Sequence, residues 1–289
     1  MCPGDARRRR GGCRRYFAGR VYRGPCIWYT VRNRRGRLYD AGYARSEQSQ
    51  LGRHGRYMVW YNGAADIRMP YPTEDELHLF PDISGKTVLD IGCGSGHSLC
   101  WCAGKGAKEL WGLDLSTKQI ENARQHLTQS GYSPKLYNMP MERECGLPKR
   151  YFDIVYSIYA IGWTTDLKAT FHNIASYLKP GGVFIFSWDH PFMHCVDAAG
   201  EQLVITSSYT RDEVFSYIQR GQPVTVQNRR LSTYINELAD AGFTIERCIE
   251  QTDSETLSRP PEFSSGYYSA WRAQKLPLSF IVKARKLPD

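Results

Sequence analysis

Three glycines at strict alternation follow the end of an apolar run. Residues 88–96 are Val-Leu-Asp-Ile-Gly-Cys-Gly-Ser-Gly, which places Asp90 just before the three glycines Gly92, Gly94 and Gly96. Glycine has no Cβ and tolerates positive φ, so such a turn lets a ligand approach bare backbone. Backbone N–H groups and the start of the next helix then face the space above the strand. The spacing therefore predicts a ligand-binding turn.

The nearest alternative is the dinucleotide fingerprint G-x-G-x-x-G, which requires a glycine at position 97. Position 97 is His97, and the third glycine comes one residue early, at Gly96. This shift disfavours an NAD site. Another nucleotide site and a purely structural turn both remain compatible with the glycines alone.

A single carboxylate, Asp114, ends the next apolar run, eighteen residues after Gly96. A carboxylate is an acceptor-only group, so it can take hydrogen bonds from both hydroxyls of a ribose. Asp114 could instead cap the following helix, but Ser116 is the better cap candidate. The position of Asp114 therefore favours a nucleoside ligand, without distinguishing one nucleoside from another.

Two further segments follow in a fixed order. Phe152-Asp-Ile-Val-Tyr-Ser157 is an apolar strand, and Leu178-Lys-Pro-Gly-Gly182 precedes another. Together with the glycine turn and Asp114, these segments span about 100 residues. Their order resembles that of the class I S-adenosylmethionine-dependent methyltransferases over residues 70–289. The resemblance implies methyl transfer with S-adenosylmethionine as the cofactor.

The resemblance also implies which residues hold the cofactor. The loop after the third strand of the family flanks the adenine, and here Pro140 stands where the family often has Asp. Recognition of the adenine amine then falls to a backbone carbonyl or to Glu142, with Met141 against the ring, unless this is an ordinary polar loop. The predicted cofactor-binding residues are Asp90, Gly92, Cys93, Gly94, Gly96, Asp114, Leu115, Met141, Glu142 and Ser157.

Aromatic side chains cluster at the strand ends nearest the transferable methyl group. Tyr159, Trp163 and Trp188 could form walls against the sulfonium or a flat acceptor. His190 is the candidate general base, because imidazole accepts a proton near neutral pH. Equally, His190 could be a strand-end histidine fixed by Pro191. No metal site is predicted.

The order of elements after residue 80 predicts an α/β fold, a doubly wound, mostly parallel seven-stranded sheet with helices on both faces and an antiparallel last strand. The expected strands are 87–91, 109–114, 135–138, 152–157, 183–188, 243–249 and 278–284. The expected helices are 95–104, 117–130, 166–178 and 231–241.

Three regions are expected along the chain. Residues 1–45 form an Arg-rich segment that is disordered or a mis-assigned start, and residues 46–80 form a helical lid region. Residues 81–289 form the methyltransferase domain. Within it, residues 190–230 exceed a normal loop and are expected to lie over the active site.

Charge is distributed unevenly. Residues 1–68 carry sixteen arginines, no lysine and four acidic residues, whereas residues 69–289 carry 22 basic and 25 acidic residues. The methyltransferase domain expected at residues 81–289 is therefore not basic. The Arg-rich segment could be an arm that binds nucleic acid or a membrane surface, a transit peptide or an out-of-frame start. Nine cysteines without a C-x-x-C pair favour a reduced, cytoplasmic protein, and no membrane span is expected.

The resulting functional prediction is methyl transfer to an oxygen or nitrogen of a small molecule. The alternatives are an RNA methyltransferase that uses the basic arm, a non-catalytic S-adenosylmethionine-binding protein and, least favoured, an NAD-type oxidoreductase. Nucleic acid is the less favoured acceptor because two motifs of base-methylating enzymes are missing. Ser157-Ile-Tyr-Ala stands where adenine-methylating enzymes of this fold usually carry Asp, Asn or Ser followed by Pro-Pro and an aromatic residue, and the Pro-Cys of C5-methylating enzymes occurs only at the remote Cys26. The sequence leaves the acceptor, the methylated atom and the oligomeric state open.

Overall fold

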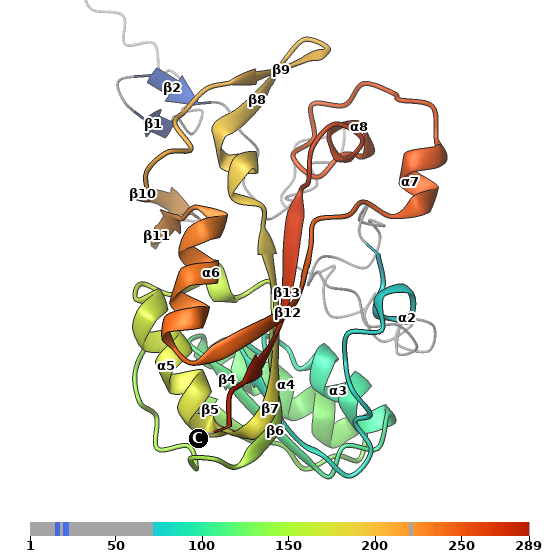
Figure 1. The fold of residues 1–289 in the computed structure, drawn as a ribbon, viewed down its shortest axis with the longest axis vertical. Coiled ribbons are helices and arrows are strands. Elements are labelled where there is room, and N and C mark those ends of the chain that lie inside the picture. Colours follow the sequence, from blue (N-terminus) through green and yellow to red (C-terminus); the bar gives the residue numbers. More distant parts are fainter. Residues whose placement is uncertain (1–14, 18–19, 23–71, 220–221, 289) are drawn as a thin grey trace, which may run out of the picture.

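A seven-stranded sheet forms the centre of the molecule (Figure 1). The computed structural model describes residues 15–17, 20–22, 72–219 and 222–288. Across the sheet the strands run in the order β12-β13-β7-β6-β3-β4-β5, and β13 is antiparallel to both of its neighbours. The strands are β3 (Thr87–Ile91), β4 (Glu109–Asp114), β5 (Lys135–Asn138), β6 (Phe152–Ile158), β7 (Leu178–Asp189), β12 (Phe243–Ile249) and β13 (Ser279–Lys286). The predicted fold class is confirmed.

Helices cover both faces of this sheet. They are α3 (His97–Gly104), α4 (Thr117–Gln129), α5 (Leu167–Tyr177) and α6 (Leu231–Asp240). Apolar residues of α3 and α4 belong to one buried cluster, and those of α5 and α6 belong to a second cluster that includes the opposite face. Ser116 caps α4 by accepting from the Gln119 amide, as its sequence position predicts.

Strand β7 begins earlier than its sequence suggests. The run Lys-Pro-Gly-Gly predicts a break before Val183, but β7 starts at Leu178, which pairs with Phe152 of β6. Gly181 adopts φ +73°, which lets the strand pass through a local irregularity instead of ending there. From Val183 to Asp189 every residue of β7 is buried, because β6 and β13 flank it on its two edges.

Additional elements gather beyond the carboxyl end of β7 (Figure 1). We call residues 190–230 and 250–278 the cap. Its elements are η2 (Pro191–Cys195), β8 (Val196–Ala199), β9 (Gln202–Ile205), β10 (Glu213–Gln219), β11 (Gln222–Asn228), α7 (Ser254–Ser258) and α8 (Ala270–Ala273). The sequence predicts an insertion at 190–230 but no element between residues 250 and 277, so α7 and α8 are additions to the predicted fold.

Little of the expected N-terminal regions lies among the described residues. In the Arg-rich segment, β1 (Arg15–Phe17) and β2 (Arg20–Tyr22) form an antiparallel pair where no strand is predicted. Strands of three residues are too short to show an alternating pattern. Of the expected lid region 46–80, the described part contains α2 (Glu74–Leu77), and residues 46–71 lie outside the described residues.

Candidate active site

The glycine turn is tied to the neighbouring strand β4. The amides of Gly92 and Cys93 both donate to the carbonyl of Leu113, at 2.7 and 3.0 Å. All three glycines have positive φ, and a Cβ on Gly92 would lie 2.2 Å from the Cβ of Ala160. A side chain therefore cannot be accommodated at position 92, which keeps this turn close to the end of β6.

Asp90 lies directly below the turn and is 1% exposed. Ser98 donates a hydrogen bond to its Oδ2, whereas Oδ1 has no hydrogen-bond partner among the described residues. Burial raises the pKa of Asp90 to about 7, against the hydrogen bond from Ser98, which lowers it. A buried carboxylate oxygen that lacks a donor is costly, so a ligand that brings a cation or a donor would stabilise this site.

Asp114 bridges the glycine turn and the start of α4. Its Oδ2 accepts from the Gly94 amide at 2.9 Å, and its Oδ1 accepts from the Ser116 amide at 2.8 Å. Burial raises the pKa of Asp114, while both of these hydrogen bonds lower it. The two contacts fix the orientation of the carboxylate at the carboxyl end of β4, where a ribose could meet its remaining lone pairs.

The predicted adenine-flanking residues lie around the same end of the sheet. Leu115 is 72% exposed, which is unusual for a leucine next to a buried strand and leaves an apolar surface beside Asp114. The Cε of Met141 would lie 3.8 Å from a Cβ on Gly92. Glu142 accepts a hydrogen bond from the Thr165 hydroxyl at 2.8 Å.

The side chains of two predicted cofactor residues make structural contacts instead. The Cys93 sulfur lies 2.9 Å from where a Cβ on Gly112 would be, so it packs into β4. The Ser157 hydroxyl donates to the Ile91 carbonyl at 2.7 Å and is fully buried. Any contact of Cys93 or Ser157 with the cofactor would therefore come from the backbone.

The three predicted acceptor-site aromatics lie together. The ring of Trp188 lies 5.6 Å from that of Tyr159 and 5.5 Å from that of Trp163, measured between centroids. Trp188 packs directly on the backbone of Gly162, where a Cβ would lie 1.8 Å from its Cε2. Tyr159 has φ +53°, an uncommon conformation for a tyrosine that directs this segment across the end of the sheet.

His190 is held on both of its ring nitrogens. Its Nδ1 accepts from the Phe192 amide at 3.2 Å, and its Nε2 lies 2.7 Å from Oε1 of Glu250. Because Nδ1 is the acceptor, the neutral ring carries its proton on Nε2 and donates to Glu250. Burial lowers the pKa of His190, although Glu250 raises it. In this arrangement His190 has no free lone pair to accept a proton.

The residue before it, Asp189, is not among the site residues predicted from the sequence. Asp189 is 2% exposed, and its Oδ1 accepts from the Tyr159 hydroxyl at 3.0 Å and from the Tyr268 hydroxyl at 2.7 Å. Burial raises its pKa to about 6, against both tyrosines. Tyr268 comes from the cap and carries no local motif, so only the structure brings it to Asp189.

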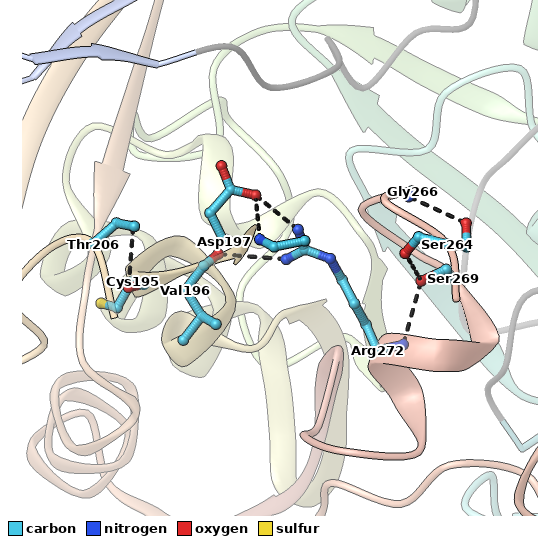
Figure 2. A network of polar contacts seen from close by, with 9 residues as sticks. Cys195, Val196, Asp197, Thr206, Ser264, Gly266, Ser269 and Arg272 are labelled. Carbon is cyan, nitrogen blue, oxygen red and sulfur yellow. Dashed lines mark hydrogen bonds and ion pairs between the residues drawn. The ribbon is translucent and has the colours of Figure 1, made fainter. Parts of the chain in front are cut away.

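An ion pair links two segments of the cap (Figure 2). Arg272 of α8 is 2% exposed and donates to Asp197 of β8 at 2.9 Å and to the Val196 carbonyl at 3.4 Å. Ser269 caps the same short helix. The ion pair thus joins the two parts of the cap, and Tyr268 lies four residues before Arg272.

No group of three or more His, Cys, Asp or Glu side chains among the described residues is arranged to hold a metal ion. Within the same part of the chain, none of the helices combines the length and hydrophobicity needed to cross a bilayer.

Comparison with known proteins identifies the family. A family model described as "Methyltransferase domain" matches residues 89–186. A protein of Haemophilus influenzae is 31% identical over 225 residues, which cover 73% of this chain and 85% of that protein. The structure of an S-adenosylmethionine-dependent methyltransferase from Mesorhizobium loti matches with a TM-score of 0.60 and 26% identity, covering 73% of this chain and 95% of that one. The chain belongs to the class I S-adenosylmethionine-dependent methyltransferases.

Partial matches extend to methyltransferases with a named pathway. The ubiquinone biosynthesis O-methyltransferase of Azoarcus sp. is 35% identical over 105 residues, which are 36% of this chain and 45% of that enzyme. The corresponding enzyme of Salmonella newport is 31% identical over 121 residues, 42% of this chain and 48% of that enzyme. This methyltransferase therefore spans about half the length of these two relatives.

The cofactor is S-adenosylmethionine, and the described residues fit it. The cofactor carries an ammonium and a sulfonium, and Asp90 has a buried carboxylate oxygen without a partner in the described chain. Its ribose needs an acceptor such as Asp114, and its adenine needs an apolar surface such as Leu115. The turn at Gly92 has no room for a side chain.

Proposed function

We propose that this methyltransferase transfers the methyl group to an oxygen or nitrogen of a small molecule, and that Asp189 accepts the proton. The observation that carries the proposal is the buried carboxylate of Asp189 between Tyr159 and Tyr268, closed over by the cap. A site built from three aromatic rings and a hydrogen-bonded carboxylate suits a small, partly apolar acceptor. The partial likeness to ubiquinone biosynthesis O-methyltransferases supports the same class of acceptor.

On the cofactor side, the proposed binding residues are those predicted from the sequence. Asp90 would pair with the ammonium, and Asp114 would accept from the ribose hydroxyls. Leu115 and Met141 would cover the adenine, with Glu142 nearby, and the backbone of the turn would pass beneath the cofactor. When bound, S-adenosylmethionine supplies a methyl group on a positively charged sulfur. This sulfur is a good leaving group because it departs as a neutral thioether.

On the acceptor side, the task of the protein is positioning. Holding the nucleophile in line with the methyl group can lower the barrier by roughly 7–11 kcal/mol. Tyr159, Trp163 and Trp188 would position the acceptor, and Asp189 would take the proton that the nucleophile loses as its bond to the methyl carbon forms. Because both tyrosines already donate to Oδ1, the carboxylate has a fixed orientation. His190, whose ring is held by Glu250 and by the Phe192 amide, would then position Asp189 through the backbone.

A transfer assay with isotopically labelled methyl groups tests this proposal. The full chain would be incubated with labelled S-adenosylmethionine and, separately, with a protein-free metabolite extract and with total RNA. Label in small molecules, and none in RNA, is the expected result. Label in RNA alone would overturn the small-molecule assignment and favour the basic arm of residues 1–68, whose structure lies mostly outside the described residues.

A further inference from the structure

Two arginines of the described chain are almost completely buried, and they differ in one respect. Arg272 is 2% exposed and is paired with the carboxylate of Asp197 (Figure 2). Arg229 is 4% exposed, but no acidic side chain of the described residues forms an ion pair with it. A buried charge without a counter-ion costs several kcal/mol, so a group of opposite charge is expected wherever one persists.

The contacts of Arg229 satisfy its guanidinium only in part. Its Nη2 donates to the Thr164 carbonyl at 2.6 Å. Its Nη1 is buried and has no hydrogen-bond acceptor among the described residues. Asp212 forms an ion pair with the next residue, Arg230, at 3.0 Å. No ion pair joins Asp212 to Arg229. The missing partner of Arg229 is therefore an anionic oxygen.

Arg229 lies on the acceptor side of the sheet. Thr164 directly follows the turn η1 (Ile161–Trp163), which carries Trp163. Burial raises the pKa of the Tyr234 hydroxyl to about 12, whereas the charge of Arg229 and a hydrogen bond between Arg229 and this hydroxyl lower it. Thr164 follows Trp163, whose ring lies 5.5 Å from that of Trp188, the residue before Asp189, so Arg229 and the proposed proton acceptor flank the same aromatic cluster.

We propose that Arg229 binds a carboxylate group of the methyl acceptor, so that the acceptor is a small carboxylic acid. This inference rests on the proposed function, because it assumes a small-molecule acceptor. A hydrogen bond between two charged groups is short and strong when water is excluded, as it is at Nη1. The same contact would fix the distance of the acceptor from Asp189 and so select which of its atoms meets the methyl group.

A carboxylate matches this site better than a phosphate. The described residues place one unpaired positive charge here, and a carboxylate neutralises it one for one. A phosphate would bring up to two negative charges into a buried site that already holds Asp189 nearby. Entry of the ligand requires the segment around Arg229 to move from η1, to which it is held by the Arg229 contact and by Gln227 donating to the Thr165 carbonyl at 2.7 Å.

The wild-type chain provides the first test. A metabolite extract would be divided by anion exchange, and each fraction would be incubated with the methyltransferase and labelled S-adenosylmethionine. We expect label only in the anionic fraction, in a product that the exchanger still retains. Amidation of the carboxylates with carbodiimide and methylamine should abolish labelling, whereas phosphatase treatment should leave it unchanged.

The opposite results separate two failures. Label in the neutral fraction, a labelled product that is no longer anionic, or loss of labelling after phosphatase treatment would each overturn the carboxylate inference while leaving small-molecule methylation in place. Label in RNA, with none in either metabolite fraction, would overturn the proposed function itself.

Variants of Arg229 test the residue. Arg229→Gln should raise the KM of the labelled acceptor by about 10–150-fold, the range expected for a hydrogen bond between charged groups, without changing the affinity for S-adenosylhomocysteine. Arg229→Lys keeps the charge, so its KM should lie between those of the wild type and Arg229→Gln. Arg230→Gln, the matched control on an exposed ion pair, should leave KM unchanged. An unchanged KM in a folded Arg229→Gln would mean that Arg229 is only structural.

Discussion

The cofactor side and the acceptor side of this methyltransferase are assembled from very different stretches of chain. On the cofactor side, Gly94 and Asp114 meet across two adjacent parallel strands and are twenty residues apart. On the acceptor side, Tyr159, Asp189 and Tyr268 meet from a strand end, the next strand end and the cap, with Asp189 and Tyr268 79 residues apart. The first side follows from the sheet itself, whereas the second depends on how the cap folds over it.

The largest effect is expected on the cofactor side. Asp114→Ala removes the carboxylate that would accept from both ribose hydroxyls. Hydrogen bonds to charged groups contribute about 1.5–3 kcal/mol each, so the affinity for S-adenosylhomocysteine should fall on the order of 10²–10⁴-fold by calorimetry. Asp166→Ala removes only the cap of α5 and should leave that affinity unchanged. Unchanged affinity in Asp114→Ala would show that Asp114 does not bind the ribose hydroxyls of the cofactor.

A smaller but still large effect should appear on the acceptor side alone. Asp189→Asn should lower kcat at least about 10²-fold, the lower range for loss of a general base, with S-adenosylhomocysteine affinity intact. His190→Gln should lower kcat less, because His190 already uses both of its ring nitrogens. The reverse ranking of the two variants would return the role of proton acceptor to His190.

Two glycine substitutions that introduce steric clashes test the acceptor side and the cofactor side separately. Gly162→Ala drives a Cβ into Trp188, which should lower the free energy of unfolding by about 1–3 kcal/mol and reduce methyl transfer without changing cofactor affinity. Gly92→Ala should reduce cofactor affinity and also lower stability, because its Cβ would lie 2.2 Å from that of Ala160. Gly104→Ala meets no atom within 4 Å and is the control for thermal melts. Loss of cofactor binding in a folded Gly162→Ala would show that the two sides are coupled.

The smallest effect concerns the pH profile. The hydrogen bond from Tyr268 lowers the pKa of Asp189, which burial raises to about 6. As pH falls through about 6, Asp189 becomes protonated, so kcat/KM should decline there. Tyr268→Phe should move this decline to higher pH, because loss of the hydrogen bond raises the pKa of Asp189 further. The lost hydrogen bond should lower the free energy of unfolding by about 1 kcal/mol. Tyr267→Phe should leave the profile in place, and an identical profile in both would exclude Asp189 as the titrating group.

This contrast also explains how much the sequence could predict. The central strands β3, β6 and β7 were predictable because each contains a run of apolar residues buried between neighbouring strands. The N-cap of α4 was predictable because Ser116 acts within its own turn. The early start of β7 was not, since a Pro-Gly-Gly run ordinarily ends an element and Gly181 allows it to continue.

The acceptor side lacks local signals of that kind. Tyr268 lies in an irregular segment, and nothing in its neighbours in sequence indicates a contact with Asp189. Arg229 follows a short strand in a region where charge alone suggests a solvated side chain, yet it is buried. Tertiary packing decides both positions, and periodicity carries no information about it.

The position of β13 has a consequence for biogenesis. This strand inserts between β7 and β12, and its register with β7 joins residues about one hundred positions apart, such as Val183 and Arg285. Until the ribosome has released residue 286, β7 presents an apolar edge with unsatisfied backbone groups, which is a surface prone to pairing with other chains. Completion of the sheet therefore waits until β13 has been synthesised, and truncation before Ser279 should produce aggregates instead of a smaller enzyme.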